Sequence, residues 1–196
     1  YSPSVDGSEV RKKLSLNGKF VVGWFGRMGK QKALKEVLIP LIKMYKGRRD
    51  LFFLVGGYGP LEEEFKSISQ ENYAYVGYLP LGKVAKYMAA CDVLLVPLNP
   101  KFKHTQITIS AKMLHSVALG KPVIATRTRA AQLLFGKYRS VVQVEASVEE
   151  FSKALEEIRS NYSSYKKAAL DIIDELKQRF DMESIVKQMA DAAIDP

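Results

Sequence analysis

The sequence predicts an α/β fold: a doubly wound parallel sheet followed by a helical C-terminal tail. Three observations support this prediction. Strand-like apolar runs alternate with amphipathic helical patterns up to about residue 146. The runs "FLV" and "VLLVP" are continuously apolar, as strands buried on both faces of a sheet require. From about residue 147 onward the pattern is purely helical.

The expected strands and helices alternate in order along the chain. A strand over residues 19–25 precedes an amphipathic helix over residues 32–47, and the strand "DLFFLVGG" precedes the helix "PLEEEFKSIS". Next come the strand "YAYVGYL", the helix "GKVAKYMAAC" and the buried strand "DVLLVPL". The helix "SAKMLHSVALG", the strand "KPVIAT", the helix "RAAQLLF" and the strand "SVVQV" complete the sheet. Three helices form the tail: "SVEEFSKALEEIRSN", "SYKKAALDIIDELKQRF" and "MESIVKQMADAAI".

The loops that follow these strands are the expected ligand sites, because ligands of doubly wound sheets bind outside the carboxyl ends of the strands. These loops are "GRMGKQK", "GGYGP", "GYLPLG" and "NPKFKHTQITIS". The last of them leads into a helix that ends at Gly120, and Pro122 then opens the next strand.

Length and composition are consistent with one domain over residues 1–196, with the tail from about residue 147. Because the chain begins with Tyr1 rather than methionine, we expect it to be one lobe of a larger protein. No apolar run is long enough to span a membrane, and the single Cys91 cannot form an internal disulfide, so a cytoplasmic location is expected. The net charge of +9 suits a phosphate-bearing partner. It is spread over helical faces without a dense basic tract, which disfavours nucleic acid as that partner.

The loop "GRMGKQK" is the first candidate anion site. Arg27, Lys30 and Lys32 stand just before a helix, where cations, backbone amides and the helix dipole all favour a diphosphate. A solvated basic turn explains the same residues equally well.

Other candidates are weaker. The turn "GGYGP" lacks the Lys-Ser/Thr of a P-loop, so it is better interpreted as a tight strand-to-helix turn. His104 in "KFKHTQITIS" is either a proton carrier or a solvated loop residue. It stands eleven residues from His115 without a cluster of cysteines or acids, so no metal site is expected.

Taken together, these motifs resemble the C-terminal, nucleotide-sugar-binding half of glycosyltransferase family 4 (group 1), whose enzymes have the GT-B fold. The family pattern of Gly-Arg, with Lys-Gly five residues after the arginine, is matched by "GRMGKQKA", where alanine replaces the second glycine. The turn "GYGP" and the strand ends "YVGY" and "CDVLLVP" match its next motifs in order. The family's "Glu-Ala-Met-Ala-x-Gly-x-Pro-Val" motif is matched by "HSVALGKPV". The resemblance implies a Rossmann-like lobe.

The resemblance also implies residue roles. Arg27 and Lys32 would hold the donor diphosphate and stabilise charge on the leaving nucleotide, so that neither a metal nor another cofactor is needed. The start of the helix at residues 108–110 would supply amides to the phosphates, and the loop at residues 77–78 would meet the base. The expected nucleotide-sugar-binding residues are Gly26, Arg27, Lys32, Gly77, Tyr78, Thr108, Ile109, Ser110 and His115.

The sequence departs from the family at its paired glutamates, which lie eight residues apart. Ile107 and His115 stand in those positions here, and neither is acidic. Lys112 matches the "Lys-x-x-Glu" form seen in some members. His115 could replace the ribose-facing glutamate by hydrogen bonding, or it could be a helix residue without a ligand role. No residue replaces the sugar-facing glutamate.

These observations lead to the hypothesis of the donor-binding half of a retaining glycosyltransferase, a hexosyltransferase that uses a UDP, GDP or ADP sugar. An N-terminal lobe outside this chain would hold the acceptor, which is a glycan, a lipid or another molecule, and peripheral membrane association of the full-length protein is compatible with that. The chain alone is expected to bind nucleotide but to turn over little. The alternative is a degenerate, non-catalytic module that binds a nucleotide or a polyanion.

Overall fold

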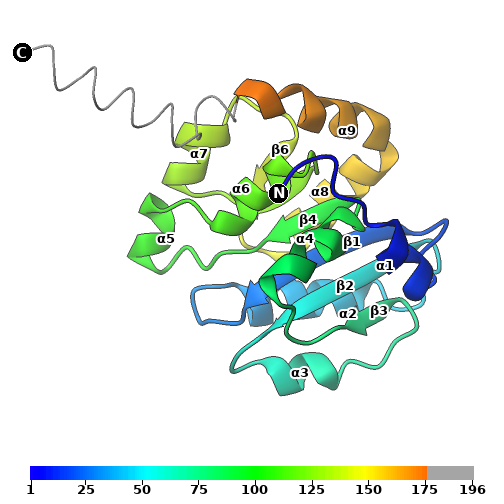
Figure 1. Cartoon of the computed structure of the whole chain (residues 1–196). Coiled ribbons are helices and arrows are strands. Elements are labelled where there is room, and N and C mark those ends of the chain that lie inside the picture. The colour runs from blue at the N-terminus through cyan, green and yellow to red at the C-terminus, as the bar shows by residue number, and fades with distance from the viewer. Residues whose placement is uncertain (176–196) are drawn as a thin grey trace, which may run out of the picture.

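The computed structural model describes residues 1–175, and its centre is one sheet of six parallel strands between layers of helices (Figure 1). The strand order is β3-β2-β1-β4-β5-β6, so the winding direction reverses between β1 and β4. The predicted doubly wound parallel sheet is thereby confirmed. The strands are β1 (Phe20–Arg27), β2 (Leu51–Tyr58), β3 (Tyr73–Tyr75), β4 (Val93–Val96), β5 (Val123–Thr126) and β6 (Val141–Val144).

Helices connect the strands, and two helices of the predicted tail, α8 and α9, follow β6. The third predicted tail helix, over residues 182–194, lies outside the described residues. Two short helices, α1 and α5, occur where the sequence predicted none, the second inside the expected loop "NPKFKHTQITIS". The helices are α1 (Ser8–Lys13), η1 (Leu34–Leu38), α2 (Ile39–Met44), α3 (Glu62–Lys66), α4 (Leu81–Ala89), α5 (Lys103–Ile107), α6 (Ala111–Ala118), α7 (Arg129–Phe135), α8 (Val148–Ser160) and α9 (Tyr162–Asp171).

The prediction of a single helix over residues 32–47 is wrong in one respect. The structure has a π-helical segment, η1, followed by the α-helix α2. The amide of Ile39 bonds to the carbonyl of Leu34, five residues back. Pro40 follows at once; it has no N–H to donate and its ring crowds the preceding turn. The wider π-turn accommodates the proline.

The two faces of the sheet bury separate apolar clusters. Trp24 and Phe53 face the cluster that includes side chains of η1, α2 and α8. Their neighbours Phe25 and Leu54 face the cluster that includes residues of α1 and α4. Adjacent residues of a strand point to opposite faces, so β1 and β2 need apolar side chains at nearly every position. The core therefore fixes both strands from both sides, and with them the loops at their carboxyl ends.

The tail packs through α8, whose N-terminus carries a testable cap. The hydroxyl of Ser147 accepts a hydrogen bond from the amide of Glu150 at 3.2 Å. Ser147→Ala should lower the free energy of unfolding by about 1 kcal/mol, as measured by urea denaturation. Ser110 occupies the N-cap position of α6 without a side-chain cap bond, so Ser110→Ala is the matched control and should cost little. Equal losses in the two variants would contradict the assignment.

Candidate functional site

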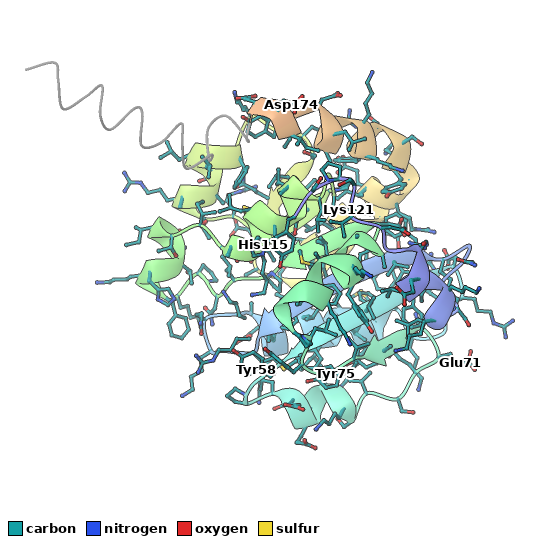
Figure 2. The ribbon with its side chains drawn as sticks, viewed as in Figure 1. Tyr58, Glu71, Tyr75, His115, Lys121 and Asp174 are labelled. Atoms are coloured by element: carbon teal, nitrogen blue, oxygen red, sulfur yellow. The ribbon has the colours of Figure 1, made fainter. Side chains whose placement is uncertain are left out.

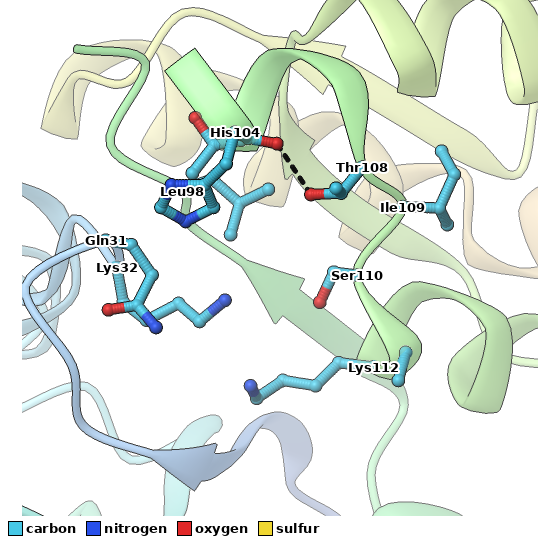
Figure 3. A pocket seen from close by; sticks show the side chains of 10 residues that line it. Gln31, Lys32, Leu98, His104, Thr108, Ile109, Ser110 and Lys112 are labelled. Atoms are coloured by element: carbon cyan, nitrogen blue, oxygen red, sulfur yellow. Dashed lines mark hydrogen bonds between the residues drawn. The ribbon is translucent and has the colours of Figure 1, made fainter. Parts of the chain in front are cut away.

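A pocket of about 320 Å³ opens between the loop after β1 and the segment that links α5 to α6 (Figure 3). It lies at the carboxyl ends of β1 and β4, where the sheet reverses its winding, as expected for the ligand site of this fold. Four predicted residues from two separate motifs meet here: Lys32 from one, and Thr108, Ile109 and Ser110 from the other. The complete lining is Gln31, Lys32, Leu98, His104, Thr105, Thr108, Ile109, Ser110, Ala111 and Lys112.

Backbone hydrogen bonds hold the Lys32 side of the pocket against the end of β4. Lys32 and Leu98 form an isolated antiparallel bridge. The amide of Ala33 donates to the carbonyl of Pro97 at 3.3 Å, and the amide of Asn99 donates to the carbonyl of Gln31 at 3.0 Å. The loop after β1 is therefore fixed beside the loop after β4, although more than sixty residues separate them in sequence.

The opposite wall is the link from α5 to α6. The hydroxyl of Thr108 donates to the carbonyl of His104 at 2.7 Å, which closes the end of α5. The Ser110 hydroxyl has no hydrogen bond to any residue within 1–175, and Figure 3 shows it directed into the pocket. The first amides of α6 have no partner inside the helix, and the positive end of its dipole lies at the same place. This wall offers donors to an anion.

Two lysines dominate the electrostatics of the pocket. Burial lowers the pKa of Lys32 below its ordinary value. Burial, followed by the nearby charge of Lys32, lowers the pKa of Lys112 to about 8. No carboxylate stands among the lining residues, so the site favours an anionic ligand over a cationic one.

Glycines at the ends of β1 and β2 allow these two strands to lie close together and the Lys112 side chain to lie against the end of β1. Gly26 has φ +144° and Gly57 has φ +156°, which L side chains rarely adopt. A Cβ on Gly57 would lie 2.0 Å from the carbonyl oxygen of Gly26, and one on Gly26 would lie 2.2 Å from Cε of Lys112. The predicted site residue Gly26 thus forms the floor on which Lys112 lies.

The other predicted residues lie outside the pocket lining. Arg27 is exposed and stands in register with Tyr58, whose ring lies edge-on to that of Tyr78 with centroids 5.4 Å apart. Arg27 is the last residue of β1, and Gly77 and Tyr78 follow β3, so all three lie at the carboxyl ends of strands but not in the pocket lining. Their roles in binding remain predictions.

Neither position of the family's paired glutamates enters the pocket lining. Ile107 is 74% exposed at the end of α5. His115 lies on α6 beside the N-terminal segment (Figure 2), and its ring stacks on that of Tyr1 with centroids 3.8 Å apart. Burial, then the chain's N-terminal charge and Lys112, lowers the pKa of His115. The proposed contact of His115 with ribose also remains a prediction.

Lys112 is the lining residue that sequence reasoning noted but left without a role. The available signal was its position, two residues after the N-cap of a helix that begins at the ligand edge of the sheet. Within residues 1–175, no group of three or more histidine, cysteine or acidic side chains is placed to hold a metal ion. Nor does this part of the chain contain a helix long and apolar enough to cross a bilayer.

Comparison with known proteins assigns the family. The family model for glycosyl transferases group 1 matches residues 19–161. The 2-deoxystreptamine glucosyltransferase of Streptomyces kanamyceticus is 29% identical over 98 residues, which are 47% of this chain and 25% of that enzyme. The chain spans between 25% and 42% of the length of the curated relatives it matches.

Solved structures of other proteins have the same fold as this chain. The Anabaena protein HepE in complex with UDP superposes with a TM-score of 0.79 at 18% identity, over 100% of this chain and 56% of that one. The C-terminal domain of the group 1 protein LpcC from Francisella tularensis superposes with a TM-score of 0.72 at 19% identity, over 93% of this chain and 96% of that one. With its Rossmann-like sheet and the family match over most of its length, this chain belongs to the group 1 glycosyl transferases and has the fold of a GT-B lobe.

Proposed function

We propose that this chain is the donor-binding half of a retaining glycosyltransferase that uses a nucleotide-diphosphate sugar. The observation that carries the proposal is the pocket at the reversal point of the sheet, where Lys32, the Ser110 hydroxyl and the start of α6 converge without a carboxylate. Backbone amides, a helix dipole and lysine side chains are the groups that bind phosphates. The UDP and UDP-glucose present in the HepE structures support a nucleotide sugar as the ligand class.

In this proposal the chain's own groups act on the leaving diphosphate. Negative charge develops there as the bond to the sugar breaks, and Lys32, together with Arg27 at the neighbouring strand end, stabilises it. The acceptor is held by a separate N-terminal lobe, and closure of the cleft between the lobes excludes water from a donor that would otherwise hydrolyse. The chain alone should therefore bind nucleotide and transfer a hexose only slowly.

Calorimetric titration with UDP, GDP and ADP tests the proposal. One nucleotide should bind selectively, and Lys32→Ala and Arg27→Ala should each weaken it by about 1.5–3 kcal/mol, the usual contribution of a charged hydrogen bond. Lys167→Ala removes the same charge from an exposed position on α9 and serves as the control. Unchanged affinity in Lys32→Ala would contradict the proposal.

A second candidate function is nucleotide binding without transfer. It is favoured by the residues at the family's glutamate positions, because Ile107 is exposed and His115 is covered by Tyr1. A protein that binds one nucleotide but leaves every donor sugar intact, even when joined to its acceptor lobe, would establish this function. Binding of any polyanion that collapses with salt, without preference among nucleotides, would instead indicate a general phosphate binder.

A further inference from the structure

Lys112 is a half-buried lysine without an acidic partner. Its side chain crosses from the first turn of α6 to the end of β1, where a Cβ on Gly26 would lie 2.2 Å from Cε and 2.6 Å from Nζ. Its Nζ also lies 5.4 Å from the centre of the buried Trp24 ring. No carboxylate among residues 1–175 forms an ion pair with it. The described part of the chain therefore leaves this ammonium group without a counter-charge.

Lys32 faces the same space from the other side. Figure 3 shows the two lysine side chains extending toward each other across the pocket, with the Ser110 hydroxyl beside them. Two ammonium groups that share one desolvated site repel each other, as the effect of Lys32 on the pKa of Lys112 indicates. An anion with at least two charges placed between them would stabilise both, and a diphosphate supplies charge on two adjacent groups.

We propose that Lys112 is a donor-binding residue, and that the diphosphate of the nucleotide sugar lies between its ammonium group and that of Lys32. This inference rests on the proposed function and assigns to α6 a side-chain contact in addition to its amides. Gly26 contributes to this arrangement, because a side chain there would displace Lys112 from its position at the end of β1.

Binding of a diphosphate between the two lysines should be coupled to the uptake of a proton. The pKa of Lys112 is lowered to about 8, so part of the unliganded protein carries it neutral above that pH. A bound diphosphate favours the charged form and raises this pKa, so binding takes up a proton and weakens as the pH rises above about 8. The other groups near it are Lys32 on the loop after β1, His104 on α5, and His115 on α6, whose lowered pKa keeps it neutral in this range.

Calorimetry with UDP in buffers of different ionisation heat measures the proton directly. At about pH 8.5 the phosphates of UDP are already deprotonated, because such groups lose their last proton near about pH 6. The wild-type chain should take up a fraction of a proton at this pH. Lys112→Met should bind about 10- to 100-fold more weakly at neutral pH and take up none. Lys167→Met, the matched surface variant, should behave as wild type.

The outcomes separate the two proposals. Failure of the wild-type chain to bind UDP, GDP or ADP overturns the proposed function and this inference with it. Wild-type affinity in a folded Lys112→Met variant overturns the inference alone. If Lys112→Met does not fold, Lys32→Met decides: it should bind more weakly but retain proton uptake, whereas loss of the uptake would assign the proton to Lys32 and overturn the inference.

Discussion

Gly57→Ala is expected to lower the free energy of unfolding by roughly 2–6 kcal/mol and to abolish nucleotide binding. The new Cβ would lie 2.0 Å from the carbonyl oxygen of Gly26, a backbone atom that no side-chain rotation can move. Positive φ contributes strain of about 1–3 kcal/mol, and overpacking contributes a further 1–3 kcal/mol or so. Relief would require β1 and β2 to part at Gly26, where Lys112 lies.

A second glycine with positive φ serves as a control that separates the cost of backbone strain from the cost of the steric clash. Gly18 also has positive φ, at +75°, but a Cβ there would meet no atom within 4 Å. Gly18→Ala should therefore show the strain alone and retain full UDP affinity. Urea denaturation and UDP titration of both variants measure the two effects. Similar losses of stability in the two, with binding intact in Gly57→Ala, would show that the close approach of β1 and β2 does not shape the pocket.

Most of the sheet could be predicted from the sequence, because burial on both faces leaves a strong pattern. The residues of β2 and β4 are nearly all apolar, and such runs have few alternatives in a chain of this length. The predicted turn after β2 also lies where expected, with φ +136° at Gly59. The fold class could thus be predicted because burial on both faces of the sheet makes the sequence of each strand apolar.

The elements that the sequence did not predict depend on contacts rather than on pattern. α1 is held by Arg11, which bonds at 2.7 Å to the carbonyl of Ala90 and at 3.2 Å to Asp92. α5 is a single turn whose polar sequence resembles a loop, and it is fixed by the Thr105 hydroxyl bonded to the carbonyl of Asn99 at 2.9 Å. Segments this short carry too few residues for a periodic signal.

The candidate site could be predicted in part for a topological reason. The carboxyl ends of β1 and β4 are neighbours in a sheet that reverses between them, which brings the loops that carry Lys32 and residues 108–110 to the same edge. Lys112 and His115 are about one helical turn apart, and the sequence could not tell which of them lines the pocket. Helical side chains lean toward the N-terminus, so the residue in the first turn extends over the strand end, while His115 contacts Tyr1.

Trp24→Ala is the second variant with a large expected effect. Trp24 is 1% exposed, and its ring lies parallel to that of Phe65 with centroids 6.3 Å apart. The Nζ of Lys112 lies over the same Trp24 ring, 5.4 Å from its centroid. Removal of a buried tryptophan side chain should cost about 3–5 kcal/mol of unfolding free energy. It should also weaken UDP binding, because Lys112 loses the ring beneath its ammonium group and can leave the position that faces Lys32.

Phe151→Ala distinguishes a general loss of stability from a loss of the floor beneath Lys112. Phe151 is fully buried on α8, belongs to the same apolar cluster as Trp24 and does not line the pocket, so its removal should cost a similar 3–5 kcal/mol or so. Circular dichroism follows unfolding in both variants, since Trp24 is the only tryptophan of the chain and cannot report on its own removal. We expect the folded Trp24→Ala protein to bind UDP more weakly and Phe151→Ala to be unaffected. That result would mean that the core orients the pocket through the contact between Trp24 and Lys112. Equal affinities would mean that the backbone at Gly26 and the first turn of α6 suffice to hold Lys112 in place.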